Sequence, residues 1–242
     1  GNLAHLESVN LSLSEHARMR LRGKIDRVDL YEDEEHVYVK VIDYKTGAKA
    51  FQLGEMYHGL QLQLIVYLNA VMEMEEQKHP EKEIVPAGIF YYQMKDPFVE
   101  KEVRENLGEK AVLKELKPDG IVNSSEEVIT HLDRSFSGNS DVIPVGRNKD
   151  QSLSKTSKVL SGRGFNTLSE YTDQILNRIG QRILDGEAEI LPYELGGKTG
   201  CDYCPYQGIC GFDKKIPGYE YRKLSKLKDV EALQQMEQEV KE

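Results

Sequence analysis

The order of apolar patterns in the first 95 residues limits the fold more than any other feature of this sequence. Apolar and polar residues alternate over 17–31 and again over 37–45, which is typical of half-buried β-strands. A helical spacing follows from about 55 to 77, and a third strand is predicted at about 84–94. Two strands, a helix and another strand indicate an α/β fold in which the helix crosses over one sheet.

The first predicted strand has a regular charge pattern and one irregularity. Up to Ile25, apolar residues alternate with basic residues. These basic residues are Arg18, Arg20, Arg22 and Lys24. After Ile25 the apolar phase changes, which predicts a β-bulge or a change of covering layer near Asp26.

The rest of the chain is less regular. Residues 99–165 are polar, with weak helical patterns near 108–117 and 125–135, and we interpret them as an insertion or a lid. A capping-box pattern at 167–170 begins an amphipathic helix that should stop at Gly186. The charged tail from about Tyr221 is expected to be helical or partly disordered. We therefore divide the chain into a core at 1–98, the insertion, and a C-terminal part at 166–242 packed on the core as one domain.

Charge and hydropathy exclude several classes of protein. The net charge of −9 argues against a protein that coats nucleic acid through net charge alone, so any such contact must be local. No apolar run approaches the ~18 residues that a membrane span requires, and the first residues lack the pattern of a signal peptide. We expect a soluble, cytoplasmic protein with no membrane contact. Because the first residue is Gly1 rather than Met, we also expect a piece of a longer chain.

Two aspartates and a lysine are candidate functional residues at the ends of the first two strands. Asp43 and Lys45 end an apolar strand, and the two-residue period puts both side chains on one face. If the hairpin is centred between Glu34 and Glu35, Asp26 lies opposite Asp43. Facing carboxylates cost stability unless a cation such as Mg²⁺ lies between them. Carboxylates, a metal and a lysine suit phosphodiester hydrolysis, whereas the alternative is a surface salt bridge worth ~0–1 kcal/mol.

Gln63 interrupts an otherwise apolar stripe on the predicted helix. The other members of the stripe are Met56, Leu60, Tyr67, Val71 and Met74. A buried amide needs a polar partner, and Tyr67 lies one turn after Gln63 on the same face. The pair favours a functional site in the helix that follows the acidic strand, although a helix-edge amide in contact with water remains the alternative.

Three cysteines, Cys201, Cys204 and Cys210, lie within ten residues. An odd number in so short a span makes a disulfide framework improbable, and the two-residue gap lets neighbouring thiolates bind one metal or cluster. Such a site needs four ligands, and one is missing nearby. Zinc with a distant histidine and a reduced trio without metal are the open alternatives.

These motifs together resemble the PD-(D/E)XK nuclease domain of the RecB type. The matching residues are 23–29 with Asp26, 42–47 with Asp43, Tyr44 and Lys45, and Gln63 with Tyr67. The resemblance implies a restriction-endonuclease-like mixed sheet flanked by helices, with 1–98 as the nuclease core. It also implies that Asp26, Asp43 and the main-chain carbonyl of Tyr44 bind Mg²⁺, that Lys45 assists the attacking water, and that Gln63 and Tyr67 support the site and the DNA backbone. Ile25 stands where the family name has Pro.

The cysteine trio extends the resemblance to nearly the whole chain. Nuclease domains of this kind, in AddAB-type helicase–nucleases, carry a [4Fe–4S] cluster whose fourth cysteine lies far upstream. The implied function is trimming of the 5′-ended strand of unwound duplex DNA in double-strand break repair by recombination. The implied partners are a helicase subunit, the upstream part of the same chain and single-stranded DNA.

We also considered which residues guide the single strand and which functions compete with this one. A basic stretch is a candidate for guiding the strand, and a solvated loop with no such role is the favoured alternative; its members are Arg147, Lys149, Lys155, Lys158 and Arg163. One alternative function is a non-catalytic module that binds DNA ends, with a structural metal at the cysteines. Another is a stand-alone nuclease of the CRISPR-adaptation type.

Overall fold

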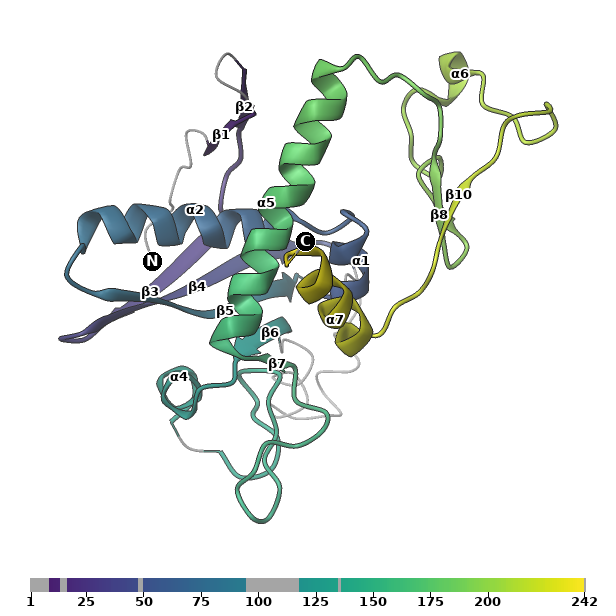
Figure 1. Ribbon diagram of the computed structural model, residues 1–242. Coiled ribbons are helices and arrows are strands. Elements are labelled where there is room, and N and C mark those ends of the chain that lie inside the picture. The colour runs from purple at the N-terminus through teal and green to yellow at the C-terminus, as the bar shows by residue number, and fades with distance from the viewer. Residues whose placement is uncertain (1–8, 14–16, 48–49, 95–117, 135, 242) are drawn as a thin grey trace.

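The computed structural model describes residues 9–13, 17–47, 50–94, 118–134 and 136–241 (Figure 1). Its centre is a five-stranded mixed sheet in the order β3-β4-β5-β6-β7. The strands are β3 (Arg27–Glu32), β4 (His36–Lys45), β5 (Glu83–Gln93), β6 (Asp119–Asn123) and β7 (Val159–Leu160). β4 runs parallel to β5, and β6 to β7, whereas the β3–β4 and β5–β6 pairs are antiparallel. The predicted mixed sheet flanked by helices is confirmed.

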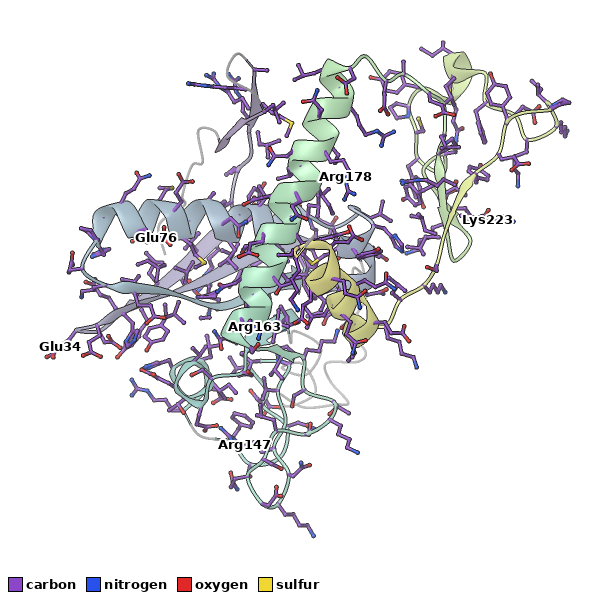
Figure 2. All side chains as sticks on the ribbon, viewed as in Figure 1. Glu34, Glu76, Arg147, Arg163, Arg178 and Lys223 are labelled. Carbon is purple, nitrogen blue, oxygen red and sulfur yellow. The ribbon has the colours of Figure 1, made fainter. Side chains whose placement is uncertain are left out.

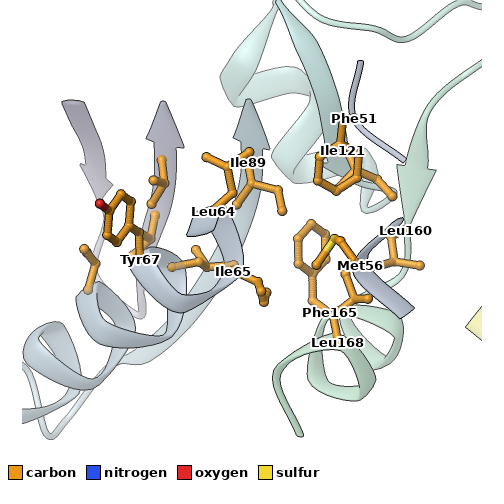
Figure 3. Packing of buried hydrophobic residues seen from close by; sticks show 14 of the residues in the cluster. Phe51, Met56, Leu64, Ile65, Tyr67, Ile89, Ile121, Leu160, Phe165 and Leu168 are labelled. Carbon is orange, nitrogen blue, oxygen red and sulfur yellow. The ribbon is translucent and has the colours of Figure 1, made fainter. Parts of the chain in front are cut away.

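One face of the sheet is covered by helices from distant parts of the chain. They are α1 (Leu53–Tyr57), α2 (Gln63–Lys78), α5 (Gly162–Leu184) and α7 (Asp229–Glu239). Figure 3 shows Phe165 and Leu168 of α5 packed beside Met56 of α1, next to Leu64 and Ile65 of α2. All five side chains are at most 1% exposed, so the main core lies on this face.

The other face is covered by α4 (Glu126–Leu132) and the loops after it. A second buried cluster lies here; its members are Ile42, Phe90, Val122, Ile129, Ile143 and Val145. The stretch 99–165, which we expected to be irregular, therefore contributes β6, α4 and β7 to the sheet and its covering layer. The helical pattern near 125–135 is confirmed by α4, while the pattern near 108–117 lies outside the described residues. The division into core, insertion and C-terminal part stays a prediction.

Two predicted helix boundaries are wrong. The helix expected over about 55–77 is divided into α1 and α2, because Gly59 adopts a left-handed conformation with φ of +78° that ends the first segment. The amphipathic helix begins at Gly162 rather than near 167, since Ser161 caps it by accepting a hydrogen bond from Gly164 N at 3.1 Å. Its predicted end is confirmed: α5 ends at Leu184, and Gly186 has φ of +73°.

The first predicted strand is also divided. β2 (Arg18–Leu21) pairs with β1 (Val9–Ser12) in a separate two-stranded sheet, and residues 22–26 connect β2 to β3. The irregularity expected near Asp26 is therefore confirmed, but it separates two strands rather than bending one.

The C-terminal part has an extended segment and then a docked helix. The segment contains β8 (Tyr193–Leu195), β9 (Lys198–Thr199), α6 (Gln207–Cys210) and β10 (Arg222–Leu224), and it projects from the sheet (Figure 1). α7 then returns to the core, where Ala232 and Met236 are completely buried. Among the described helices, none is long and apolar enough to cross a membrane.

Candidate active site

Asp43 and Lys45 project from the end of β4 on the same face. Asp43 is only 3% exposed, and Lys45 Nζ lies 2.5 Å from its Oδ2 atom. The predicted shared face is thus confirmed. Within the described part of the chain, no donor besides Lys45 Nζ reaches Asp43 Oδ2. A buried carboxylate with an incompletely satisfied oxygen is costly, which favours a site that accepts a cation.

Asp26 lies beside this strand end. The β3–β4 hairpin has the predicted register, in which Arg27 pairs with Ile42, so the next step of the ladder brings Asp26 level with Asp43. The Asp26 Oδ2 atom accepts a hydrogen bond from the main-chain N–H of Tyr44 at 2.9 Å. The two carboxylates therefore come from adjacent strand ends, and such oxygen donors fit a hard divalent cation.

A chain of hydrogen bonds joins this strand end to α2. Lys45 Nζ donates to Gln63 Oε1 at 3.0 Å, and Gln63 Nε2 donates to the Tyr67 hydroxyl oxygen at 3.1 Å. The predicted association of Gln63 with Tyr67 is confirmed. The expectation that Gln63 is buried is wrong: it is the first residue of α2 and is exposed, because the break after α1 puts this position at the open end of the helix.

Two further residues pack closely around this hydrogen-bonded chain. Gly23 lies directly against Tyr67, since a Cβ atom at this glycine would be 2.8 Å from the Tyr67 hydroxyl. Lys45 Nζ lies 5.5 Å from the centre of the Tyr91 ring. Burial first, and then the negative charges of Asp43 and Glu55, raise the pKa of the Tyr91 hydroxyl above its ordinary value. Tyr91 therefore stays neutral at the back of the site.

The sequence did not identify three residues around an adjoining cavity of about 460 Å³, namely Glu55, Gln61 and Lys198. Lys45 also lines this cavity. Gln61 is 3% exposed, and its Nε2 atom donates to Ala50 O at 3.1 Å and contacts the Glu55 carboxylate. A lone amide between two leucines just after a glycine was a signal for Gln61. Lys198 comes from β9, more than a hundred residues away in sequence, and had no such signal.

The three cysteines lie apart from this site, in the projecting segment. All three are free and partly buried. In the described ranges, one group of three His, Cys, Asp or Glu side chains has its ligand atoms within 4.8 Å of one another, and it is Asp33, His36 and Glu127 at the opposite end of β4. The cysteine sulfurs do not meet that distance, and the occupancy of a cluster site stays a prediction.

The basic stretch expected to guide DNA is partly neutralised. Arg147 forms an ion pair with Glu126, and Lys158 forms one with Asp119, each at 2.5 Å. Lys149, Lys155 and Arg163 are exposed. Figure 2 shows Arg163 at the start of α5 and Arg147 in the loops beyond α4. The five residues thus do not form a continuous row of free charges.

Sequence similarity links this chain to a nuclease family and to several longer proteins. The PD-(D/E)XK nuclease superfamily matches residues 2–211. The B subunit of an ATP-dependent helicase/deoxyribonuclease from Lachnoclostridium phytofermentans is 43% identical over 86% of this chain. Proteins of the same name from Alkaliphilus metalliredigens and Bacillus cereus are 41% and 35% identical over 95% and 99% of it. The chain spans only 19–21% of the length of these relatives.

Proposed function

This chain belongs to the PD-(D/E)XK nuclease superfamily, and from that premise we propose that it is a Mg²⁺-dependent DNA nuclease domain with its active site at the end of β4. One observation supports this most. The carboxylates of Asp26 and Asp43 and the ammonium group of Lys45 converge on adjacent strand ends, with Lys45 fixed by Gln63. This set of groups suits the hydrolysis of phosphodiester bonds.

Asp26, Asp43 and the main-chain carbonyl of Tyr44 would hold the ion. Asp43 supports this assignment, because its buried Oδ2 atom has no donor besides Lys45 Nζ within the described residues, and a divalent cation would complete its surroundings. When bound, Mg²⁺ lowers the pKa of a coordinated water and stabilises negative charge on the phosphate oxygens.

Lys45 acts on the water and the phosphate. Its ammonium group lies between Asp43 Oδ2 and Gln63 Oε1, so two oxygen atoms hold it at the site. From there it donates a hydrogen bond to the attacking water or to a phosphate oxygen. Gln63 and Tyr67 are positioning residues: Tyr67 is 9% exposed and holds the Gln63 amide, which in turn orients Lys45.

The wider role follows from the relatives. Their name describes the B subunit of an ATP-dependent helicase/deoxyribonuclease, and this chain matches about one fifth of their length. We infer that the domain works in such a larger protein with a helicase partner, in the cytoplasm. There it would trim the 5′-ended strand of unwound DNA during double-strand break repair by recombination.

We assign Cys201, Cys204 and Cys210 as three of the four thiolate ligands of a [4Fe–4S] cluster. The two-residue gap and the partial burial of all three cysteines support a shared ligand group, and the fourth cysteine would lie outside this chain. Iron and acid-labile sulfide in anaerobically purified full-length protein test this assignment. Stoichiometric zinc in their place would refute it.

The catalytic assignment is tested by substitution in the full-length protein. Asp43→Ala or Lys45→Ala should lower Mg²⁺-dependent DNA cleavage by at least about 10²–10⁴-fold, because each removes a group that acts on the reacting atoms. ATP-driven unwinding should be retained. The matched control is Lys40→Ala: this lysine is on the same strand but pairs with Asp29 at 2.7 Å. If Lys45→Ala cleaved DNA as fast as Lys40→Ala, the catalytic assignment would be wrong.

A further inference from the structure

A row of exposed basic residues leads along the chain to the candidate active site. From Ala17 to Lys24 every second side chain is exposed and the intervening ones are partly buried. All the exposed ones are basic; they are Arg18, Arg20, Arg22 and Lys24, and we call them the basic stripe. Arg18 and Arg20 lie on β2, where a rise of about 3.3 Å per residue puts them roughly 6.6 Å apart, and Arg22 and Lys24 continue the alternation in the segment that connects β2 to β3. Asp26, a proposed metal ligand, follows Lys24 by the same interval of two residues.

Within the described residues, the charges of the basic stripe are unpaired. None of its four side chains takes part in an ion pair or side-chain hydrogen bond with another described residue. Arg147 and Lys158 of the basic stretch at 147–163 are instead paired with carboxylates. The chain has a net charge of −9, so four unpaired cations in one line create a local region of positive potential on an otherwise negative protein.

Contacts at both ends fix the stripe relative to the site. Before β2, the side chain of Leu13 packs so closely on α5 that a Cβ atom at Gly180 would be 2.5 Å from it. At the other end, Gly23 lies between Arg22 and Lys24 and touches the ring of Tyr67. The Tyr67 hydroxyl accepts a hydrogen bond from Gln63, and Gln63 in turn accepts one from Lys45. The stripe therefore ends where the proposed catalytic groups begin.

We propose that the basic stripe binds the phosphate backbone of single-stranded DNA and directs it to Asp26, Asp43 and Lys45. This inference rests on the proposed nuclease function and identifies how its substrate is held. A single line of cations along β2 and the segment after it matches one line of phosphates, whereas duplex DNA presents two. The competing explanation is that charged side chains only keep the open edge of a two-stranded sheet soluble, and it predicts no contribution to DNA binding.

Binding without cleavage tests the proposal. The affinity of this chain for a fluorescent oligothymidylate is measured in EDTA over a range of salt concentrations. We plot the logarithm of the binding constant against the logarithm of the salt concentration. For the triple variant Arg18→Gln, Arg20→Gln, Arg22→Gln the slope should be smaller in magnitude by about 2, since each lost phosphate contact removes about 0.7. We expect at least about tenfold weaker binding near 0.1 M salt. Lys24 is left unchanged because it lies close to Asp26.

The matched control removes three exposed charges elsewhere, with Lys215→Gln, Lys223→Gln and Lys241→Gln. It should bind as the unmodified chain does, and circular dichroism should show that both triple variants are folded. An unchanged slope in the stripe variant, or an equal loss in the control, would overturn the proposal. An equal loss for a duplex of the same length would overturn the assignment to a single strand. Binding in EDTA is measured without cleavage, whereas the nuclease assignment is tested by Mg²⁺-dependent cleavage in the full-length protein, so the failure of one can be recognised separately from the failure of the other.

Discussion

The two regions with candidate functional residues differ in how their positions are fixed. Asp43 lies on a strand with apolar layers on both faces, and its neighbours Val41 and Ile42 are at most 3% exposed. The cysteines lie within residues 181–231, all of which the structure describes, and none of these residues is buried. Packing alone therefore preorganises the end of β4. The cysteine segment has no buried core of its own, so side-chain packing contributes little to holding the three cysteines in place.

The largest expected effect tests the packed region. Phe165→Ala should destabilise the protein by about 3–5 kcal/mol, because it removes a ring that is 1% exposed at the centre of the main core. Tyr203→Ala, in the cysteine segment, should change the unfolding free energy by no more than about 0.5 kcal/mol, since Tyr203 is 99% exposed. Urea unfolding measures both. Comparable losses for the two variants would remove the contrast between the regions.

A second prediction tests the cysteine segment directly. Trypsin should cut this chain between Lys198 and Lys226 about 30-fold faster than within α2, because cleavage follows local opening and this segment buries no side chains. Mass spectrometry of the first fragments identifies the sites. In full-length protein loaded with iron and sulfide, cleavage there should slow, and Cys204→Ser should restore it. First cuts within α2 would contradict the prediction.

A third prediction concerns the hydrogen-bonded chain that orients Lys45. Gln63→Ala should lower the kcat of DNA cleavage about tenfold, or about 1.4 kcal/mol, with little change in KM, because Lys45 loses its 3.0 Å partner. The melting temperature should not change, since Gln63 is exposed. Gln77→Ala, at an exposed position of the same helix, is the control. A fall in melting temperature that accounts for the lost activity would show a structural role instead.

The acidic hairpin was predictable from sequence because strand alternation and a plausible turn centre fix its register. The facing positions of Asp26 and Asp43 follow from that pattern, and the observed pairing of Arg27 with Ile42 confirms the register, whereas the role of these aspartates and of Lys45 was suggested by the family resemblance. Helix boundaries were less predictable, since one glycine conformation at Gly59 divides a pattern that reads as continuous.

Residues brought in from distant elements could not be predicted at all. β7 has only two residues, too few for any periodicity, and its place in the sheet depends on pairing with β6. Lys198 reaches the cavity beside Lys45 only because the projecting segment folds back toward α1. The alternating charges of the basic stripe were visible in the sequence. That the stripe ends next to Tyr67 could not be predicted, because it depends on the contact between Gly23 and the Tyr67 ring.

The smallest expected effect compares one aspartate from each region. Burial tends to raise the pKa of Asp29, but its hydrogen bonds with Arg27 and Lys40 outweigh this, and the net pKa is lowered. A lowered pKa stabilises the fold above the ordinary titration range of aspartate, and that stability is lost as the pH falls through the folded-state pKa. Asp29→Asn should therefore cost at most about 1 kcal/mol at neutral pH, and the difference should shrink progressively as the pH falls below about 4.

Asp202 in the cysteine segment provides the matched case. Hydrogen bonds from the Thr199 hydroxyl and main-chain N–H lower its pKa, but the side chain is fully exposed. Because these bonds join two neighbouring residues outside the core, Asp202→Asn should leave global unfolding unchanged at every pH. Urea unfolding between pH 3 and 8 measures both variants. If Asp202→Asn showed a pH-dependent loss as large as that of Asp29→Asn, the cysteine segment would be coupled to the core, and the contrast between the two regions would not hold.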